Sequence, residues 1–99
     1  MVIIGTNSFP PESANEIGKR FLELPPLPDY MTVKGPYVHG MMEGGIQGVE
    51  VFDLDKAKLA EGVEYVTNRY VTYFGIPGFR YAVTPYFEAE EALKMIGLA

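Results

Sequence analysis

Proline and glycine divide this chain into segments whose hydrophobic periodicity alternates between that of a strand and that of a helix. Residues 2–9 ("VIIGTNSF") are short and β-branched, which predicts a buried strand. Pro10 and Pro11 suit the first turn of a helix, where a missing N–H costs little. Residues 12–24 then carry one apolar stripe at helical spacing, formed by Ala14, Ile17, Phe21 and Leu24.

The next two segments predict a β-hairpin. Residues 31–43 have the composition of a strand, and the Gly-Pro pair within them places this strand at an edge of the sheet. Gly44 and Gly45 predict the turn, and residues 46–52 ("IQGVEVF") predict a third strand.

A second helix has the clearest start in the chain. Asp55 suits the N-cap, and Leu54 and Leu59 occupy the two positions of a hydrophobic staple around it. Gly75 suits a left-handed C-terminal cap. The apolar stripe between these ends is formed by Leu59, Val63, Val66, Tyr70 and Phe74.

A fourth strand at 79–87 and a short helix at 88–97 complete the order βαββαβ plus a terminal helix. Two split βαβ units with right-handed crossovers give a four-stranded antiparallel sheet with both long helices on one face. Residues 1–99 are therefore expected to form a single α+β domain of the ferredoxin-like class. The first and third strands are expected at its centre.

Side-chain alternation divides the sheet residues between two faces. On the helix-covered face we expect the bulkier set, formed by Phe79, Tyr81, Val83, Pro85 and Phe87 with Val49 and Val51. On the uncovered face we expect Arg80, Ala82, Thr84 and Tyr86 with Gly48, Glu50 and Phe52. That face measures roughly 400 Å² and is too apolar to remain solvated. A second copy of the chain is expected to cover it.

Composition excludes several classes of function. The net charge of −5, with scattered basic residues, argues against nucleic acid and anionic membranes as partners. The absence of cysteine excludes disulfides and thiolate metal sites, and no metal or other cofactor is expected. No apolar run is long enough for a membrane span or a signal peptide, so a cytoplasmic location is the default expectation.

Four local motifs resemble the dimeric α/β-barrel superfamily. They are "FPPE" after the first strand, "YVHG" in the second, "GVEVFD" through the third and "FRYAVTPYF" in the fourth. The resemblance covers nearly the whole chain and is closest to small single-domain members of uncharacterised function. It implies a dimer with an internal cavity. Its enzymatic members include cofactor-free monooxygenases, isomerases and haem-degrading oxygenases.

The haem-degrading members use an Asn on the first strand, a His on the second helix and a Trp. This chain has Asn7 on the first strand, but it has no tryptophan and no histidine in the second helix. That departure argues against haem chemistry.

Two residues are candidates for proton transfer. His39 is the single histidine and titrates near neutrality when unperturbed, although a merely hydrogen-bonded histidine near a hairpin is the simpler interpretation. Glu50 lies in a central strand, where a buried unpaired charge is costly, so we expect it to pair with Arg80, with His39 or with a group across the dimer. The alternative is a carboxylate that lines a ligand cavity.

The sequence leaves two functions open. In the first, a homodimer binds a small apolar or aromatic molecule and acts as a cofactor-free monooxygenase or isomerase, with His39 and Glu50 as catalytic candidates. The residues expected to bind the substrate are Asn7, Arg80, Thr84 and Tyr86. In the second, the dimer is a non-catalytic binding or regulatory module. The sequence does not decide whether the protein is an enzyme.

Overall fold

In the computed structural model, which describes residues 1–98, the elements follow the predicted order. The strands are β1 (Val2–Phe9), β2 (Met31–Gly40), β3 (Ile46–Leu54) and β4 (Arg80–Tyr86). The α-helices are α1 (Ala14–Leu22), α2 (Leu59–Val71) and α3 (Ala89–Met95), and single 3₁₀ turns precede α1 and α2 (Pro11–Ser13 and Lys56–Lys58). Within residues 1–98, no helix combines the length and apolar character that crossing a lipid bilayer requires.

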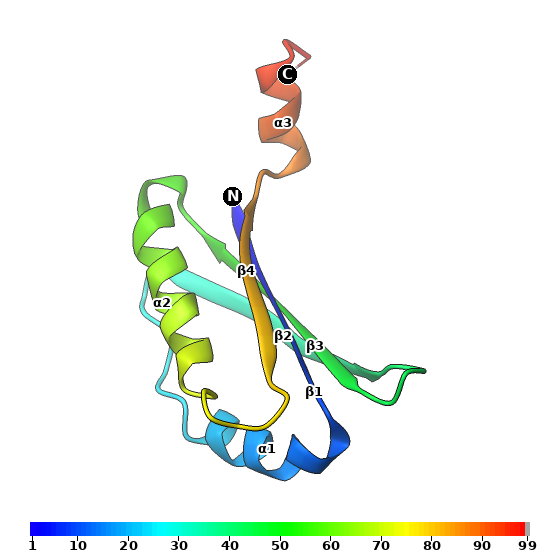
Figure 1. The fold of residues 1–99 in the computed structure, drawn as a ribbon. Helices are drawn as coiled ribbons and strands as arrows, with labels where there is room; N and C mark the ends of the chain where they lie inside the picture. Colours follow the sequence, from blue (N-terminus) through cyan, green and yellow to red (C-terminus); the bar gives the residue numbers. More distant parts are fainter. Residues whose placement is uncertain (99) are drawn as a thin grey trace.

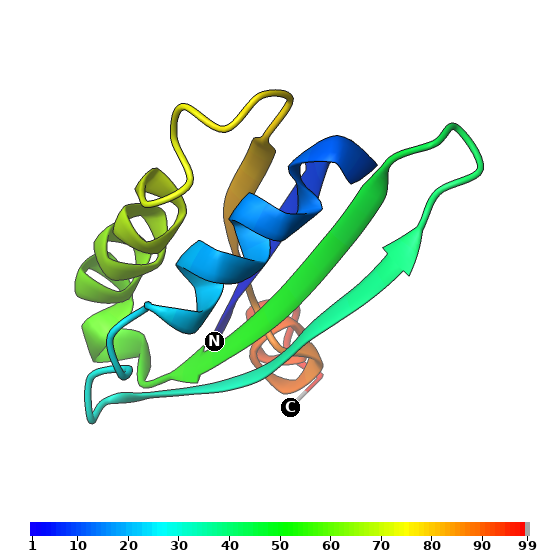
Figure 2. The ribbon, with the colours of Figure 1, turned by 90° about the horizontal axis from the view of Figure 1, so that it is seen from below.

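The four strands form one antiparallel sheet with the order β2-β3-β1-β4. Helices α1 and α2 lie side by side on one face of this sheet and leave the other face open (Figures 1 and 2). Helix α3 extends beyond the end of β4, away from the rest of the fold (Figure 1). The expected α+β sheet, its central strands β1 and β3 and its edge strand β2 are thus confirmed.

The predicted ends of α2 are also close to those observed. The Asp55 carboxylate accepts a hydrogen bond of 3.1 Å from the Ala57 N–H, but it caps a 3₁₀ turn, so the α-helix itself begins at Leu59. Gly75 has the predicted left-handed conformation, with a φ of +88°, but it does not cap α2, whose C-cap is Thr72. Phe74, the last residue of the predicted stripe, lies past the helix and is half exposed.

The core lies between α2 and the centre of the sheet. Its most deeply buried side chains are Ile3, Phe52, Val66 and Tyr70. The aromatic residues that follow α2 complete this core, since Tyr81 stacks on Tyr70 with ring centroids 5.5 Å apart. In the aromatic-rich stretch 70–87 the chain itself therefore covers Tyr70, Tyr73 and, in part, Phe79, whereas Phe74, Tyr81, Tyr86 and Phe87 are exposed.

The prediction of which side chains face the helices is wrong for β3 and right for β4. Phe52 is fully buried opposite Ile3, and Glu50 is only 6% exposed, so Gly48, Glu50 and Phe52 face the helices. Val49 and Val51 lie on the open face instead. The error arose because the strand was ended at residue 52: Leu54, which is buried, extends the Gly48–Glu50–Phe52 set and makes it the more apolar one.

The open face of the sheet is apolar at its centre and polar at one end. Register places Ile4, Val51 and Thr84 in one row across the sheet, and Thr6, Val49 and Ala82 in the next. The row nearest the β2–β3 hairpin is polar and consists of His39, Gln47, Ser8 and Arg80. The two valines are partly exposed, so an apolar strip remains accessible on this face.

Two helix glycines differ in what surrounds them. A Cβ on Gly62 of α2 would overlap Leu54 and lie 3.1 Å from Ile3 Cδ1, so close packing requires glycine there. A Cβ on Gly18 of α1 would have no atom within 4 Å. Close helix packing therefore accounts for the glycine at position 62 but not for Gly18.

These surroundings predict opposite effects for the same substitution. Gly18→Ala should raise the free energy of unfolding by about 1 kcal/mol, because alanine favours the helix and nothing opposes its methyl group. Gly62→Ala gains the same propensity but overpacks the core, and it should lower the free energy of unfolding by about 1–2 kcal/mol. Urea unfolding of both variants at one protein concentration measures the difference. Equal shifts of the two midpoints would contradict this packing.

Candidate functional site

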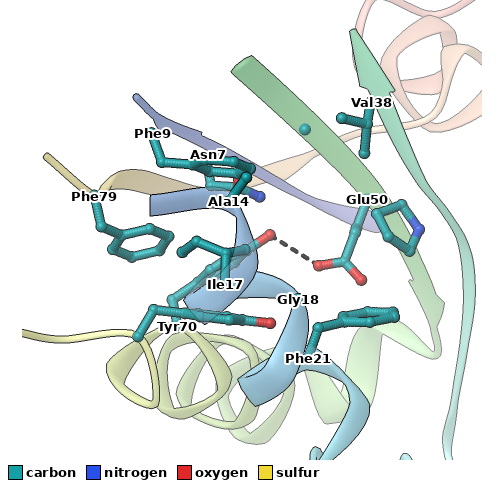
Figure 3. Close-up of a pocket in the computed structure, with 13 residues that line it drawn as sticks. Asn7, Phe9, Ala14, Ile17, Gly18, Phe21, Val38, Glu50, Tyr70 and Phe79 are labelled. Carbon is teal, nitrogen blue, oxygen red and sulfur yellow. Dashed lines mark hydrogen bonds between the residues drawn. The ribbon is translucent and has the colours of Figure 1, made fainter. Parts of the chain in front are cut away.

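A pocket of about 300 Å³ opens between α1 and the sheet (Figure 3). Helix α1 forms one wall, and the sheet together with the residues around the end of α2 forms the other. The lining is almost entirely apolar, and Glu50 is its one charged residue among those described. The main apolar lining residues are Phe9, Ile17, Phe21, Val38 and Phe79.

The sequence of α1 explains why this space stays open. The helix presents the small residues Ala14 and Gly18 to the pocket, and none of its residues is fully buried. Since a Cβ on Gly18 would meet no atom within 4 Å, the missing side chain contributes directly to the pocket volume. Ile17 and Phe21 flank this opening from the same helix (Figure 3).

Glu50 supplies the polar group of the pocket. The Tyr70 O–H donates a hydrogen bond of 3.1 Å to Glu50 Oε1 (Figure 3). On the other side, Arg69 Nη2 lies 3.8 Å from Glu50 Oε2, which is an ion-pair distance but too long for a hydrogen bond. Within residues 1–98, Oε2 is buried and has no hydrogen-bond donor. The carboxylate of this lining residue therefore keeps one buried acceptor atom without a hydrogen-bond donor.

Tyr70 reaches Glu50 because the neighbouring strand lacks a side chain. Gly5 of β1 is paired with Glu50 of β3. A Cβ at Gly5 would overlap the Tyr70 hydroxyl and lie 2.8 Å from the tyrosine ring. The ring therefore lies directly on the sheet. Burial, together with the adjacent Glu50 carboxylate, raises the pKa of Tyr70 well above its ordinary value, so Tyr70 stays a donor throughout the physiological pH range.

Tyr73 is a second buried phenol at the pocket. Burial first, and the Glu50 charge second, raise the pKa of Tyr73 to about 12. Asn7 adds an amide from β1, and the glycine opposite it, Gly48, leaves room for that side chain because a Cβ there would lie 3.1 Å from Asn7 Nδ2. The site thus combines one carboxylate, two neutral phenols and an amide with an apolar enclosure.

The predicted site residues divide between two surfaces. Glu50 and Asn7 line the pocket together. His39, Arg80, Thr84 and Tyr86 lie on the open face, on the other side of the sheet from Glu50. His39 is exposed, with Nδ1 3.1 Å from the Gly40 carbonyl oxygen and Nε2 2.9 Å from Gln47 Oε1.

Two of the partners expected for Glu50, Arg80 and His39, are therefore wrong. Neither Arg80 nor His39 approaches its carboxylate, because alternation along each strand places both of them on the opposite face. Arg80 instead borders a shallow polar hollow with Ser8 and Gln47. The actual partners, Tyr70 and Arg69, are consecutive residues at the end of α2.

Sequence reasoning missed these partners and the contribution of α1. Tyr70 was predicted as a core residue from its helical spacing, which is correct but says nothing of its hydroxyl. Gly18, an unfavourable residue in a helix interior, was the one signal in the sequence that pointed to the pocket.

Among residues 1–98, no group of three or more His, Asp or Glu side chains is placed to hold a metal ion. Comparisons with known proteins found no matching family model, no matching curated protein and no matching solved structure.

The buried tyrosines predict a loss of stability in alkali. In the unfolded chain a tyrosine releases its proton near pH 10, whereas in the fold Tyr73 holds it until about pH 12. Above pH 10 the folded state therefore binds more protons, and the free energy of unfolding falls as pH rises. Tyr73→Phe should reduce this fall by up to about 1.4 kcal/mol per pH unit.

Urea unfolding midpoints of the wild type and Tyr73→Phe, measured at pH 8, 9, 10 and 11, test this expectation. Groups that titrate in both proteins cancel in the comparison. Parallel pH profiles for the two proteins would show that Tyr73 ionises equally well in the folded and unfolded states.

Proposed function

We propose that this protein is a homodimer that binds a small, largely apolar or aromatic molecule in the pocket beneath α1. In this proposal Glu50 accepts and returns a proton on the bound molecule. The observation that carries the proposal is the free, buried Oε2 atom of Glu50 at an otherwise apolar pocket. A buried acceptor without a donor is costly, and a ligand that supplies a proton relieves that cost.

The dimensions of the pocket support a small ligand. A volume of about 300 Å³ lies at the lower end of the range for small-molecule sites and suits a molecule of one or two rings. The side chains of Phe21, Phe79 and Tyr73 provide aromatic contacts for its body. Asn7 provides an amide that orients a polar substituent.

The proposed chemistry is proton transfer at carbon. Glu50 removes a proton from a carbon next to a carbonyl group, and the electron pair moves into the carbonyl as an enolate. In a β,γ-unsaturated ketone the enolate is conjugated with the double bond as a dienolate, and return of the proton to the γ carbon completes an isomerisation. Reaction of the enolate with dioxygen would begin a cofactor-free oxygenation. Tyr70 holds the carboxylate in place through its hydrogen bond to Oε1.

The proposed dimer rests on the open face of the sheet. Val49 and Val51 are partly exposed there and lie beside Ile4 and Ala82, which gives an apolar surface of the kind that a second copy of the chain covers. A flat area of roughly 400 Å² per chain is less than the ~800 Å² per partner of a standard interface. Tyr37 of β2, which is paired with Val49, is exposed on the same face, and Leu93 and Met95 of α3 are further exposed apolar residues that a partner could cover.

In such a dimer the residues of the open face have a different role from Glu50. His39, Arg80, Thr84 and Tyr86 would lie at the contact between the two copies, where they pair with the partner or line a space between the sheets. Of the residues expected from the sequence, Glu50 and Asn7 are thus retained for the pocket.

Hydrogen exchange in a ligand-sized ketone tests the proposed proton transfer. We expect the wild-type protein in D₂O to accelerate deuterium uptake at the carbons beside the carbonyl group of 2-tetralone, as measured by proton NMR. Glu50→Gln should lower this rate by 100-fold or more, because a general base contributes about 10²–10⁴ to a rate. His39→Gln should leave it unchanged, because His39 lies on the other face of the sheet.

The outcome also separates the two functions left open by the sequence. Binding of 2-tetralone without any exchange would favour the non-catalytic binding module. Equal exchange rates for the wild type and Glu50→Gln would contradict the role of Glu50.

A charge on the open face tests the dimer. Val49→Glu introduces a carboxylate at the centre of the apolar strip and should weaken dimerisation by 100-fold or more, because burying an unpaired charge is costly. Leu22→Glu, on the 83% exposed Leu22 of α1, is the matched control and should remain dimeric. Sedimentation equilibrium at micromolar concentration measures both. A wild-type protein that sediments as a monomer would overturn the dimer.

A further inference from the structure

We infer that the pocket selects uncharged ligands, ketones among them, and prefers those that also carry an O–H or N–H group, and that Arg69 is the residue that sets this selectivity. The inference rests on the proposed binding of a small molecule beneath α1 and adds the chemical class of that molecule. It is carried by the positions of three groups: the Glu50 carboxylate, the Arg69 guanidinium and the Tyr70 hydroxyl.

Arg69 already compensates the charge of Glu50. The two side chains are 11% and 8% exposed, and Arg69 Nη2 lies 3.8 Å from Oε2. The guanidinium is held in position over the Phe52 ring, with its Cζ 5.9 Å from the ring centroid. Glu50 at the pocket lining and Arg69 behind it therefore form a buried pair that is neutral as a whole.

This neutrality disfavours ligands with a charge of either sign. An ammonium group would add a third charge to a buried pair that is already balanced, and its loss of hydration would remain uncompensated. A carboxylate or phosphate would lie against the Glu50 carboxylate, with Arg69 behind it rather than at the pocket lining. The remaining residues that line the pocket provide no charge to pair with either group.

An uncharged donor is the group that matches the free atom. Arg69 balances the negative charge of Glu50, but it is too far from Oε2 to donate a hydrogen bond. This oxygen therefore lacks a donor. The Tyr70 hydroxyl is already used at Oε1. A ligand O–H or N–H completes the set without changing the charge balance, while its apolar body contacts Ile17 and Phe21.

Removal of Arg69 should invert this preference. In Arg69→Met the unbranched side chain still covers Phe52, but the Glu50 charge is left unbalanced, so an ammonium group becomes its best partner. Arg69→Lys keeps the positive charge and is the matched control. The double variant Glu50→Gln with Arg69→Met lacks both charges. It therefore has no unbalanced buried charge and can still be measured if Arg69→Met alone folds poorly.

Four probes of equal ring size measure the selectivity at pH 7: 2-naphthol, naphthalene, 2-naphthoate and 2-naphthylmethylammonium. Backbone amide NMR titrations give affinities and show whether the shifts fall on α1 and β3. For the wild type and Arg69→Lys we expect 2-naphthol to bind at least 10-fold more tightly than each of the others. Arg69→Met should bind the ammonium probe at least 10-fold more tightly than the wild type does, and the double variant should not.

Each result bears on the inference. A wild-type protein that prefers either ion, or a ratio of ammonium to naphthol affinity that Arg69→Met does not change, would overturn the role of Arg69. Equal binding of all four probes in the pocket would overturn the selectivity and leave the proposed small-molecule site intact. No binding of any probe beneath α1 would contradict both.

Discussion

The hydrogen bond between Tyr70 and Glu50 joins the second helix to the middle of the sheet, and the arrangement of the site depends on it. It holds a carboxylate in a region that is otherwise core, and it requires the tyrosine ring to lie directly on the backbone of β1. Glycine at position 5 makes that approach possible. The same ring then stacks on Tyr81, so the polar contact and the aromatic core are positioned by one side chain.

A single hydrogen bond leaves the carboxylate incompletely satisfied, and this incompleteness gives the pocket its chemical character. A fully paired Glu50 would be a structural ion pair. With Arg69 at 3.8 Å and Tyr70 on the other oxygen, charge is balanced while one acceptor stays available. Helix α1 leaves room in the pocket that Glu50 lines, because Gly18 has no side chain to fill that space. Stability is given up at both positions, since a helix glycine and an unpaired buried oxygen are each unfavourable.

The fold was largely predictable from the sequence, because proline, glycine and hydrophobic periodicity act locally. Asp55 and the Gly44-Gly45 turn lie at the boundaries predicted for them, whereas α2 ends at Val71, before the predicted cap at Gly75. The site was less predictable because it depends on which face each strand residue occupies. In β3 both alternating sets contain apolar residues, and one further position, Leu54, decides between them. Glu50 and Asn7 were identified as candidates by residue type, but no local pattern predicts that Arg69 and Tyr70 would approach Glu50 from a helix.

Alternation along β3 also constrains how this protein can change. Glu50 lies under the helices, while its neighbours Val49 and Val51 lie on the open surface, so consecutive residues belong to two separate environments. Insertion or deletion of one residue within this strand would exchange the two environments at every later position. It would bring a carboxylate to the open surface and valines into the pocket at once. We therefore expect length variation among natural variants to be confined to the β2–β3 turn and to the segments that join helices to strands.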